Sequence, residues 1–114
     1  MRLTFNQNKL SYKPQIFDLK HSIKDAILFG EMAIVIFDFN NYFKTDNESN
    51  CQAFDLSNDG ERMWIAEPPK TENDSYVSFS KNTTLWSWSC YRVQIDFKTG
   101  KIINKVCLSS WFVS

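Results

Sequence analysis

One arrangement of strand and turn residues occurs twice in this chain, 41 residues apart. In each copy an alternating apolar run ends at an aspartate, Asp55 or Asp96, and a short polar loop leads to a glycine, Gly60 or Gly100. Aspartate can accept a hydrogen bond from its own backbone two residues on, and glycine adopts the positive φ of tight turns. The repeat therefore predicts two antiparallel β-hairpins. Because a β-branched residue resists positive φ, we expect Gly100→Val to destabilise the fold by about 1 kcal/mol or more.

The segment Ala33–Phe37 predicts a strand that is covered on both faces. All of its residues are apolar, whereas a strand with one solvated face alternates apolar and polar residues. This segment favours two packed layers over a single exposed sheet.

Residues 22–29 predict a short helix. Ser22 and Asp25 have the spacing of a capping box, and apolar residues from Ile23 onward recur at the three- and four-residue spacing of a helix face. Gly30 suits the left-handed position that ends a helix.

The segment that begins at Thr84 is too long for one ordinary strand. Two interpretations remain open. A bulge near residues 89–90 would bring Trp86 and Trp88 to the core side of a single bent strand. Alternatively, a turn at the same place divides the segment into a second hairpin.

These segments together predict a mainly β fold with one short helix near residues 22–29. We expect an antiparallel two-layer sandwich or one strongly curled sheet. With 114 residues, the chain is long enough for one domain with a core and too short for two, so residues 1–114 are expected to form a single domain.

Charge and cysteine content exclude several classes of partner. The 13 Lys and Arg residues balance the 13 Asp and Glu residues, whereas a nucleic-acid partner favours a basic protein. No apolar run approaches the length of a membrane span, and the first residues lack the apolar stretch of a signal peptide. Cys51, Cys90 and Cys107 lack CxxC spacing. We expect a cytoplasmic protein with reduced thiols and with no nucleic-acid or membrane partner.

Four residues of the first hairpin have the spacing of a known repeat: Ala53, Asp55, Gly60 and Trp64. They resemble one repeat of the quinoprotein-type β-propeller family, and the second hairpin resembles the same element with Ile103 in place of the tryptophan. A closed propeller needs at least four blades of roughly 40 residues, so the resemblance implies shared turn chemistry and no cofactor or metal. The C-terminal half also resembles small uncharacterised bacterial proteins.

Four aromatic residues form the candidate binding surface: Trp64, Trp86, Trp88 and Tyr91. Tryptophan and tyrosine dominate the binding energy of protein interfaces. Aromatic side chains two residues apart on a strand can also stack on sugars or bases. Alternatively, the same side chains fill the core, because a small domain has few other ways to bury enough area.

The sequence holds no motif for phosphate binding, zinc binding or nucleophilic catalysis, so we expect no enzyme and no cofactor. An acid/base hydrolase that uses Asp55 or Asp96 is the alternative, since two neighbouring carboxylates can act as acid and base. Both residues stand where a strand meets a turn, and formation of that turn explains them fully.

We therefore expect a small non-catalytic protein that acts by binding another protein, or a second copy of the chain as a homodimer. A bacterial toxin-immunity or accessory protein is one kind of protein that meets this description. The alternative function is a carbohydrate-binding module that uses exposed tryptophans.

Overall fold

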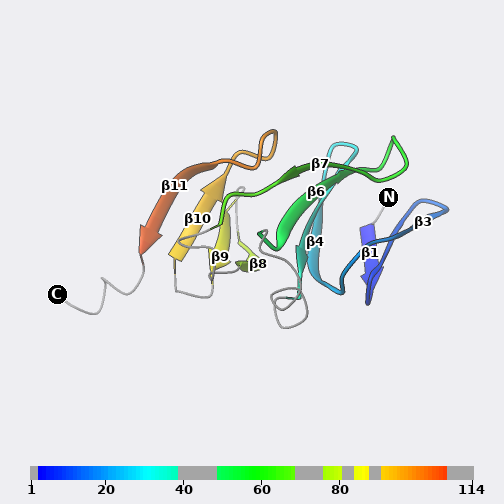
Figure 1. Ribbon diagram of the computed structural model, residues 1–114, viewed down its shortest axis with the longest axis horizontal. Coiled ribbons are helices and arrows are strands. Elements are labelled where there is room, and N and C mark those ends of the chain that lie inside the picture. The colour runs from blue at the N-terminus through cyan, green and yellow to red at the C-terminus, as the bar shows by residue number, and fades with distance from the viewer. Residues whose placement is uncertain (1–2, 39–48, 69–75, 81–83, 88–90, 108–114) are drawn as a thin grey trace.

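The computed structural model describes residues 3–38, 49–68, 76–80, 84–87 and 91–107. In these ranges the chain forms three antiparallel sheets and no helix (Figure 1). The N-terminal sheet contains β1 (Leu3–Asn6), β2 (Lys9–Tyr12) and β3 (Gln15–Asp18). The central sheet contains β4 (Ile23–Phe29), β5 (Met32–Phe37), β6 (Cys51–Asp55) and β7 (Glu61–Ile65). The C-terminal sheet contains β8 (Tyr76–Phe79), β9 (Thr84–Ser87), β10 (Tyr91–Ile95) and β11 (Ile102–Cys107). Strands that follow one another in the chain are neighbours in each sheet, so each sheet is a meander.

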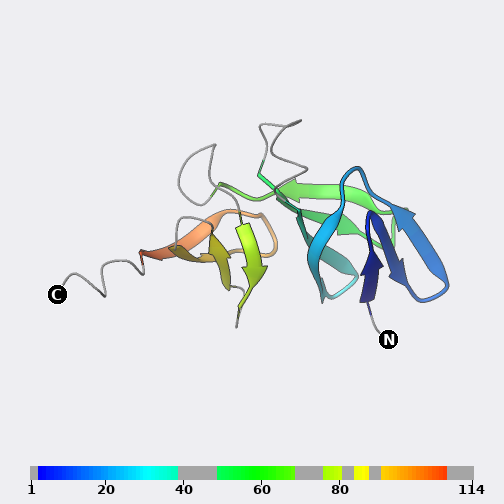
Figure 2. The same cartoon turned by 90° about the horizontal axis from the view of Figure 1, so that it is seen from below.

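The central sheet lies between the other two (Figures 1 and 2). One of its faces packs against the N-terminal sheet in an apolar cluster that includes Leu10 and Val35. Its other face packs against the C-terminal sheet in a second cluster that includes Ile34 and Val93. Burial of apolar side chains on both faces of one sheet is therefore the main force that holds the three layers together.

Strand β5 confirms the prediction of a strand covered on both faces. Ala33, Val35 and Phe37 belong to the cluster with the N-terminal sheet, and Ile34 and Ile36 belong to the cluster with the C-terminal sheet. None of the five is more than 1% exposed. Because successive side chains of a strand point to opposite faces, a wholly apolar run is what a middle layer requires.

The mainly β, antiparallel fold is confirmed, but the chain forms three sheets where two layers or one curled sheet were expected. The predicted helix near residues 22–29 is wrong, because these residues contain β4, which pairs with β5. The ladder shifts between Ile23 and Asp25. This bulge puts Ile23 and Ala26 on the same face of the strand, so their three-residue spacing imitated a helix. Gly30, at φ +63°, is the first residue of a two-residue turn to β5.

Both predicted hairpins are present, as β6–β7 and β10–β11. In each, the backbone N–H two residues after the aspartate donates to its Oδ1, at 3.0 Å for Asp55 and 2.9 Å for Asp96. Gly60 and Gly100 have φ values of +72° and +78°. The aspartate and the glycine therefore play the turn-forming roles that their spacing predicted.

The two hairpins also share a bulge. The ladder shifts by one residue just before each aspartate. The extra residue is Met63 in one hairpin and Ile103 in the other, and these side chains are 55% and 61% exposed. The register therefore gives Asn104, and not Ile103 as expected, the place that Trp64 has in the first hairpin.

The segment that begins at Thr84 forms two strands, β9 and β10, which pair antiparallel. The hairpin interpretation is correct and the single bulged strand is wrong. Trp86 lies opposite Arg92 in this ladder, and Arg92 is on the face opposite to the buried Val93. Trp86 is therefore not on the core side of the sheet.

A buried asparagine ties the central sheet to the C-terminal sheet. The Nδ2 of Asn50 donates to the carbonyl of Phe37 at 2.9 Å and to that of Tyr76 at 2.8 Å. Its Oδ1 accepts from the backbone N–H of Tyr76 at 2.9 Å. Asn50 is only 2% exposed, so these bonds replace the water that its amide loses on burial.

Each pair of neighbouring sheets is joined by the same kind of contact, an aromatic ring on a turn glycine. A Cβ atom built at Gly60 would lie 2.8 Å from Cδ1 of Phe17 in β3. A Cβ atom built at Gly100 would lie 2.5 Å from Cε3 of Trp64 in β7. In both cases the last strand of one sheet covers the Asp…Gly turn of the next sheet, and only glycine leaves room for the ring.

Candidate functional site

The candidate site is one face of the C-terminal sheet. In β10, Val93 and Ile95 are fully buried toward the central sheet, so Arg92 and Gln94 belong to the opposite face. The residues paired with them on β9 and β11 share that face, and one of these residues is Trp86. Ser78 of β8 is paired with Trp86 and also lies on this face. We call the whole set the outer face: Ser78, Thr84, Trp86, Arg92, Gln94, Asn104 and Val106.

The C-terminal sheet lies at one end of the three-sheet stack (Figures 1 and 2), and the outer face is its face opposite to the apolar cluster shared with the central sheet. Among the described residues, no other sheet packs on it, and the apolar cluster between the central and C-terminal sheets does not include Trp86. Trp86 is half-buried and Arg92 is exposed. The face therefore holds an indole and a guanidinium on directly paired positions of neighbouring strands, together with hydroxyl and amide side chains.

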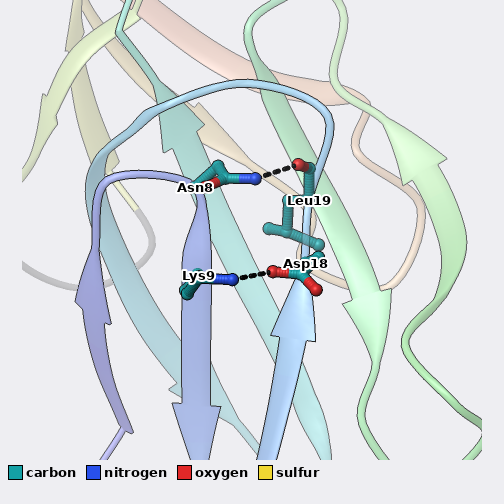
Figure 3. A network of polar contacts seen from close by, with 4 residues as sticks. All are labelled: Asn8, Lys9, Asp18 and Leu19. Carbon is teal, nitrogen blue, oxygen red and sulfur yellow. Dashed lines mark hydrogen bonds and ion pairs between the residues drawn. The ribbon is translucent and has the colours of Figure 1, made fainter.

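The opposite end of the stack is polar in another way. Lys9 and Asp18 lie opposite each other on the outward face of the N-terminal sheet, and their side chains form an ion pair at 2.6 Å (Figure 3). Beside them, Nδ2 of Asn8 donates to the carbonyl of Leu19 at 3.0 Å (Figure 3). Ile16, which is 64% exposed, is the one large apolar side chain on this face among the described residues. The described residues of this face include no aromatic side chain.

Trp64, predicted to be part of the binding surface, lies between two sheets. Its Nε1 donates to the carbonyl of Phe97 at 2.9 Å. Its ring rests on Gly100 and packs against the cluster between the central and C-terminal sheets. These contacts give Trp64 a packing role and remove it from the outer face.

Tyr91 also packs against that cluster, on the face opposite to Trp86. Its backbone N–H donates to Oγ of Ser87 at 3.0 Å, and Nζ of Lys105 lies 5.0 Å from the centre of its ring. Trp88 lies outside the described residues. Of the four aromatic residues that the sequence singled out, the structure thus places Trp86 on the outer face and directs Trp64 and Tyr91 toward the core.

The polar members of the outer face were not predicted as site residues. The alternation of Arg92 and Gln94 with apolar neighbours showed that they share one side of a strand. Which residues of β9 and β11 lie next to them depends on the strand register. A slip of one residue would move every side chain of a strand to the other face of the sheet. The sequence therefore held a signal for only part of this site.

The contacts of Asp55 and Asp96 are those of turn residues. Oδ1 of Asp55 also accepts from Oγ of Ser57 at 2.7 Å. The main-chain carbonyl of each aspartate accepts from the N–H of its turn glycine, Gly60 or Gly100, at 2.8 and 2.6 Å. The two aspartates belong to turns of different sheets. Each carboxylate is therefore engaged by its own turn.

Cys51 is a buried and free thiol. Burial away from water raises its pKa above the ordinary range, because desolvation disfavours the thiolate. His21 packs edge-on against the ring of Phe37, with ring centres 5.6 Å apart. In the described part of the chain, no three His, Cys, Asp or Glu side chains gather closely enough to hold a metal ion. The same part of the chain contains no helix with the length and apolar character to cross a membrane.

Comparison with known proteins places the chain in a family. The model of the domain of unknown function DUF7957 matches residues 1–107. The chain therefore belongs to the DUF7957 family, and the match extends over all three sheets, from β1 to the end of β11. No curated protein and no solved structure matches the chain.

Proposed function

We propose that this DUF7957 domain is a non-catalytic cytoplasmic protein that binds another protein through the outer face. The observation that carries the proposal is the placement of Trp86 beside Arg92 on a sheet face that no other described sheet covers. An immunity protein or an accessory subunit of a larger complex would act in this way.

Trp86 and Arg92 are suited to the centre of an interface. Tryptophan and arginine are the residue types most enriched among those that dominate binding energy. Trp86 lies on β9 between two paired strands, so its backbone is already ordered before a partner binds. Thr84, Gln94 and Asn104 would supply the polar rim that protein interfaces usually have.

The test compares retention of host proteins on immobilised wild-type protein and on Trp86→Ala and Arg92→Ala variants. Ile16→Ala is the matched control, since Ile16 is an exposed apolar residue at the other end of the stack. We expect a defined partner to be retained by wild type and Ile16→Ala, and to be lost from both outer-face variants by a factor of roughly 30 or more, as for a hot-spot residue. Equal retention on all four proteins would remove the outer face from the function.

A carbohydrate ligand on the same face is the second candidate. Hydroxyl and amide side chains surround Trp86, and an indole flanked by such groups can stack on a sugar ring and bond its hydroxyls. A glycan panel titrated against wild type and Trp86→Ala decides between the two. Binding of a neutral glycan that disappears in Trp86→Ala, with no protein partner found, would favour the carbohydrate function.

A further inference from the structure

The charges of the described chain are unevenly distributed between its two long hairpins. Residues 91–107 carry four cationic side chains and a single carboxylate, for a net charge of +3: Arg92, Lys98, Lys101, Lys105 and Asp96. Residues 49–68 carry the opposite excess, with four carboxylates and one arginine, for a net charge of −3. The zero net charge of the whole chain therefore hides a basic β10–β11 hairpin.

Three of the positive charges of this hairpin are exposed and form no ion pair with another described residue. Arg92, Lys98 and Lys101 are all exposed. None of the three forms an ion pair with another described residue. The single carboxylate of the hairpin, Asp96, accepts from the backbone of its own turn. A solvated positive field of this kind attracts an oppositely charged surface and accelerates its encounter with the protein.

The edge of β11 is partly closed to strand addition. The backbone N–H of Ile102 donates to Oε1 of Glu67 at 2.7 Å. The N–H of Lys105 donates to Oδ1 of Asn104 at 2.9 Å. Because side chains already satisfy these edge groups, a partner gains little from a new main-chain ladder along β11. A partner would therefore be recognised through the side chains of the hairpin and of the outer face.

We propose that the protein partner of the outer face presents an acidic surface, which the β10–β11 hairpin binds through Arg92, Lys98 and Lys101. This inference rests on the proposed function and specifies the chemistry of the partner. Arg92 belongs to both the outer face and the basic hairpin, so the acidic groups of the partner would lie around the residue that is paired opposite Trp86. A guanidinium can hold a carboxylate through two parallel hydrogen bonds.

The test uses a fluorescein-labelled 20-residue peptide of Glu, Asp and Gly with one central Trp. Fluorescence anisotropy measures its binding at low and moderate salt to wild type, to Trp86→Ala and to the double variant Lys98→Gln/Lys101→Gln. The matched control is Lys13→Gln/Lys24→Gln, which removes two exposed lysines, one from the β2–β3 turn and one from β4. Melting temperatures of all variants verify that the fold is retained.

We expect the acidic peptide to bind wild type and the control equally, and to bind Lys98→Gln/Lys101→Gln about fivefold more weakly, with an affinity that falls as salt rises. Absence of binding, or equal binding by the two double variants, would overturn the acidic partner. Tighter binding of a labelled oligothymidylate or of a heparin oligosaccharide would overturn it in favour of a nucleic acid or an acidic glycan. A host partner that is lost from Trp86→Ala but retained by Lys98→Gln/Lys101→Gln at any salt would leave the proposed function standing without this inference.

Discussion

At the residue scale, a few side chains connect neighbouring sheets. Glycine is required where an aromatic ring of one sheet packs on a turn of the next. The ring of Trp64 occupies the space in which any side chain at Gly100 would begin. Gly30 also has a positive φ, of +63°, but no atom outside its own turn lies within 4 Å of the place where a Cβ would be. A substitution at Gly30 therefore measures the free-energy cost of a positive φ alone. A substitution at Gly100 adds the cost of the clash between the new side chain and the Trp64 ring.

Gly100→Val should lower the free energy of unfolding by about 3 kcal/mol, because it combines backbone strain with displacement of the Trp64 ring. Gly30→Val should cost only about 1 to 2 kcal/mol, since it carries the backbone term alone. Urea unfolding followed by circular dichroism measures both values. Equal losses at the two positions would show that the Trp64 ring does not depend on Gly100.

Asn50→Ala should lower the free energy of unfolding by about 3 kcal/mol. It removes three buried hydrogen bonds, which Asn50 makes with the carbonyls of Phe37 and Tyr76 and with the N–H of Tyr76, and the loss of such bonds costs about 1 to 3 kcal/mol. The control is Asn58→Ala in the exposed β6–β7 turn, where Nδ2 donates only to Glu61 at 2.6 Å. A loss at Asn50 no larger than at Asn58 would contradict the role of Asn50 in joining the central sheet to the C-terminal sheet.

At the element scale, two hairpins repeat one local solution. Each combines an aspartate that accepts from its own turn, a glycine with positive φ, and a bulge just before the aspartate. These are local interactions, so they operate in whatever sheet the hairpin belongs to. We propose that the resemblance to quinoprotein-type repeats arises from this hairpin.

Asp96→Ala should lower the free energy of unfolding by about 1 kcal/mol, because it removes the acceptor for the backbone N–H of Lys98. Asp96→Asn should lower it by less than about 0.5 kcal/mol, because an amide oxygen can accept the same hydrogen bond. Thermal unfolding of both variants measures the difference. A large loss with asparagine would mean that the negative charge of Asp96, and not its acceptor geometry, is what the fold uses.

At the scale of the whole molecule, the sheet faces that pack against each other are apolar, whereas the outer face is largely polar. The central sheet presents Ala53 and Trp64 to the next sheet, and the register of the C-terminal sheet puts Gln94 and Asn104 in their places. Polar outer faces on terminal units keep repeat structures soluble and limit their growth. In the described chain, Asn104 of the outer face thus has the register position that Trp64 has in the central sheet.

Gln94→Ala/Asn104→Trp would rebuild on the outer face the surface that the central sheet uses for stacking. We expect this variant to self-associate with rising concentration, because it exposes an apolar patch shaped to receive another sheet. Sedimentation velocity compares it with wild type and with Ile103→Trp, which adds a tryptophan at an exposed bulge. Sedimentation identical to that of Ile103→Trp would contradict the account of the outer face.

Local patterns in the sequence were sufficient to predict several elements. The Asp…Gly hairpins depend on hydrogen bonds within a few residues, and the apolar run Ala33–Phe37 carries its own evidence of burial on both faces. The prediction of a short helix near residues 22–29 was wrong because a bulge in β4 changes which residues share a face of the strand. The sequence shows spacing but not the register that determines its meaning.

The sequence by itself determined that the chain is β-rich and antiparallel, where its two main turns fall, and that one strand lies in the middle of the fold. Only the tertiary structure decided that there are three sheets, that Trp64 joins two of them, and that Trp86 lies on the outer face. The physical reason is that turns and alternation are properties of neighbouring residues. Which aromatic ring is covered depends instead on cross-strand register and on the sheet packed above it, which join residues far apart in the chain.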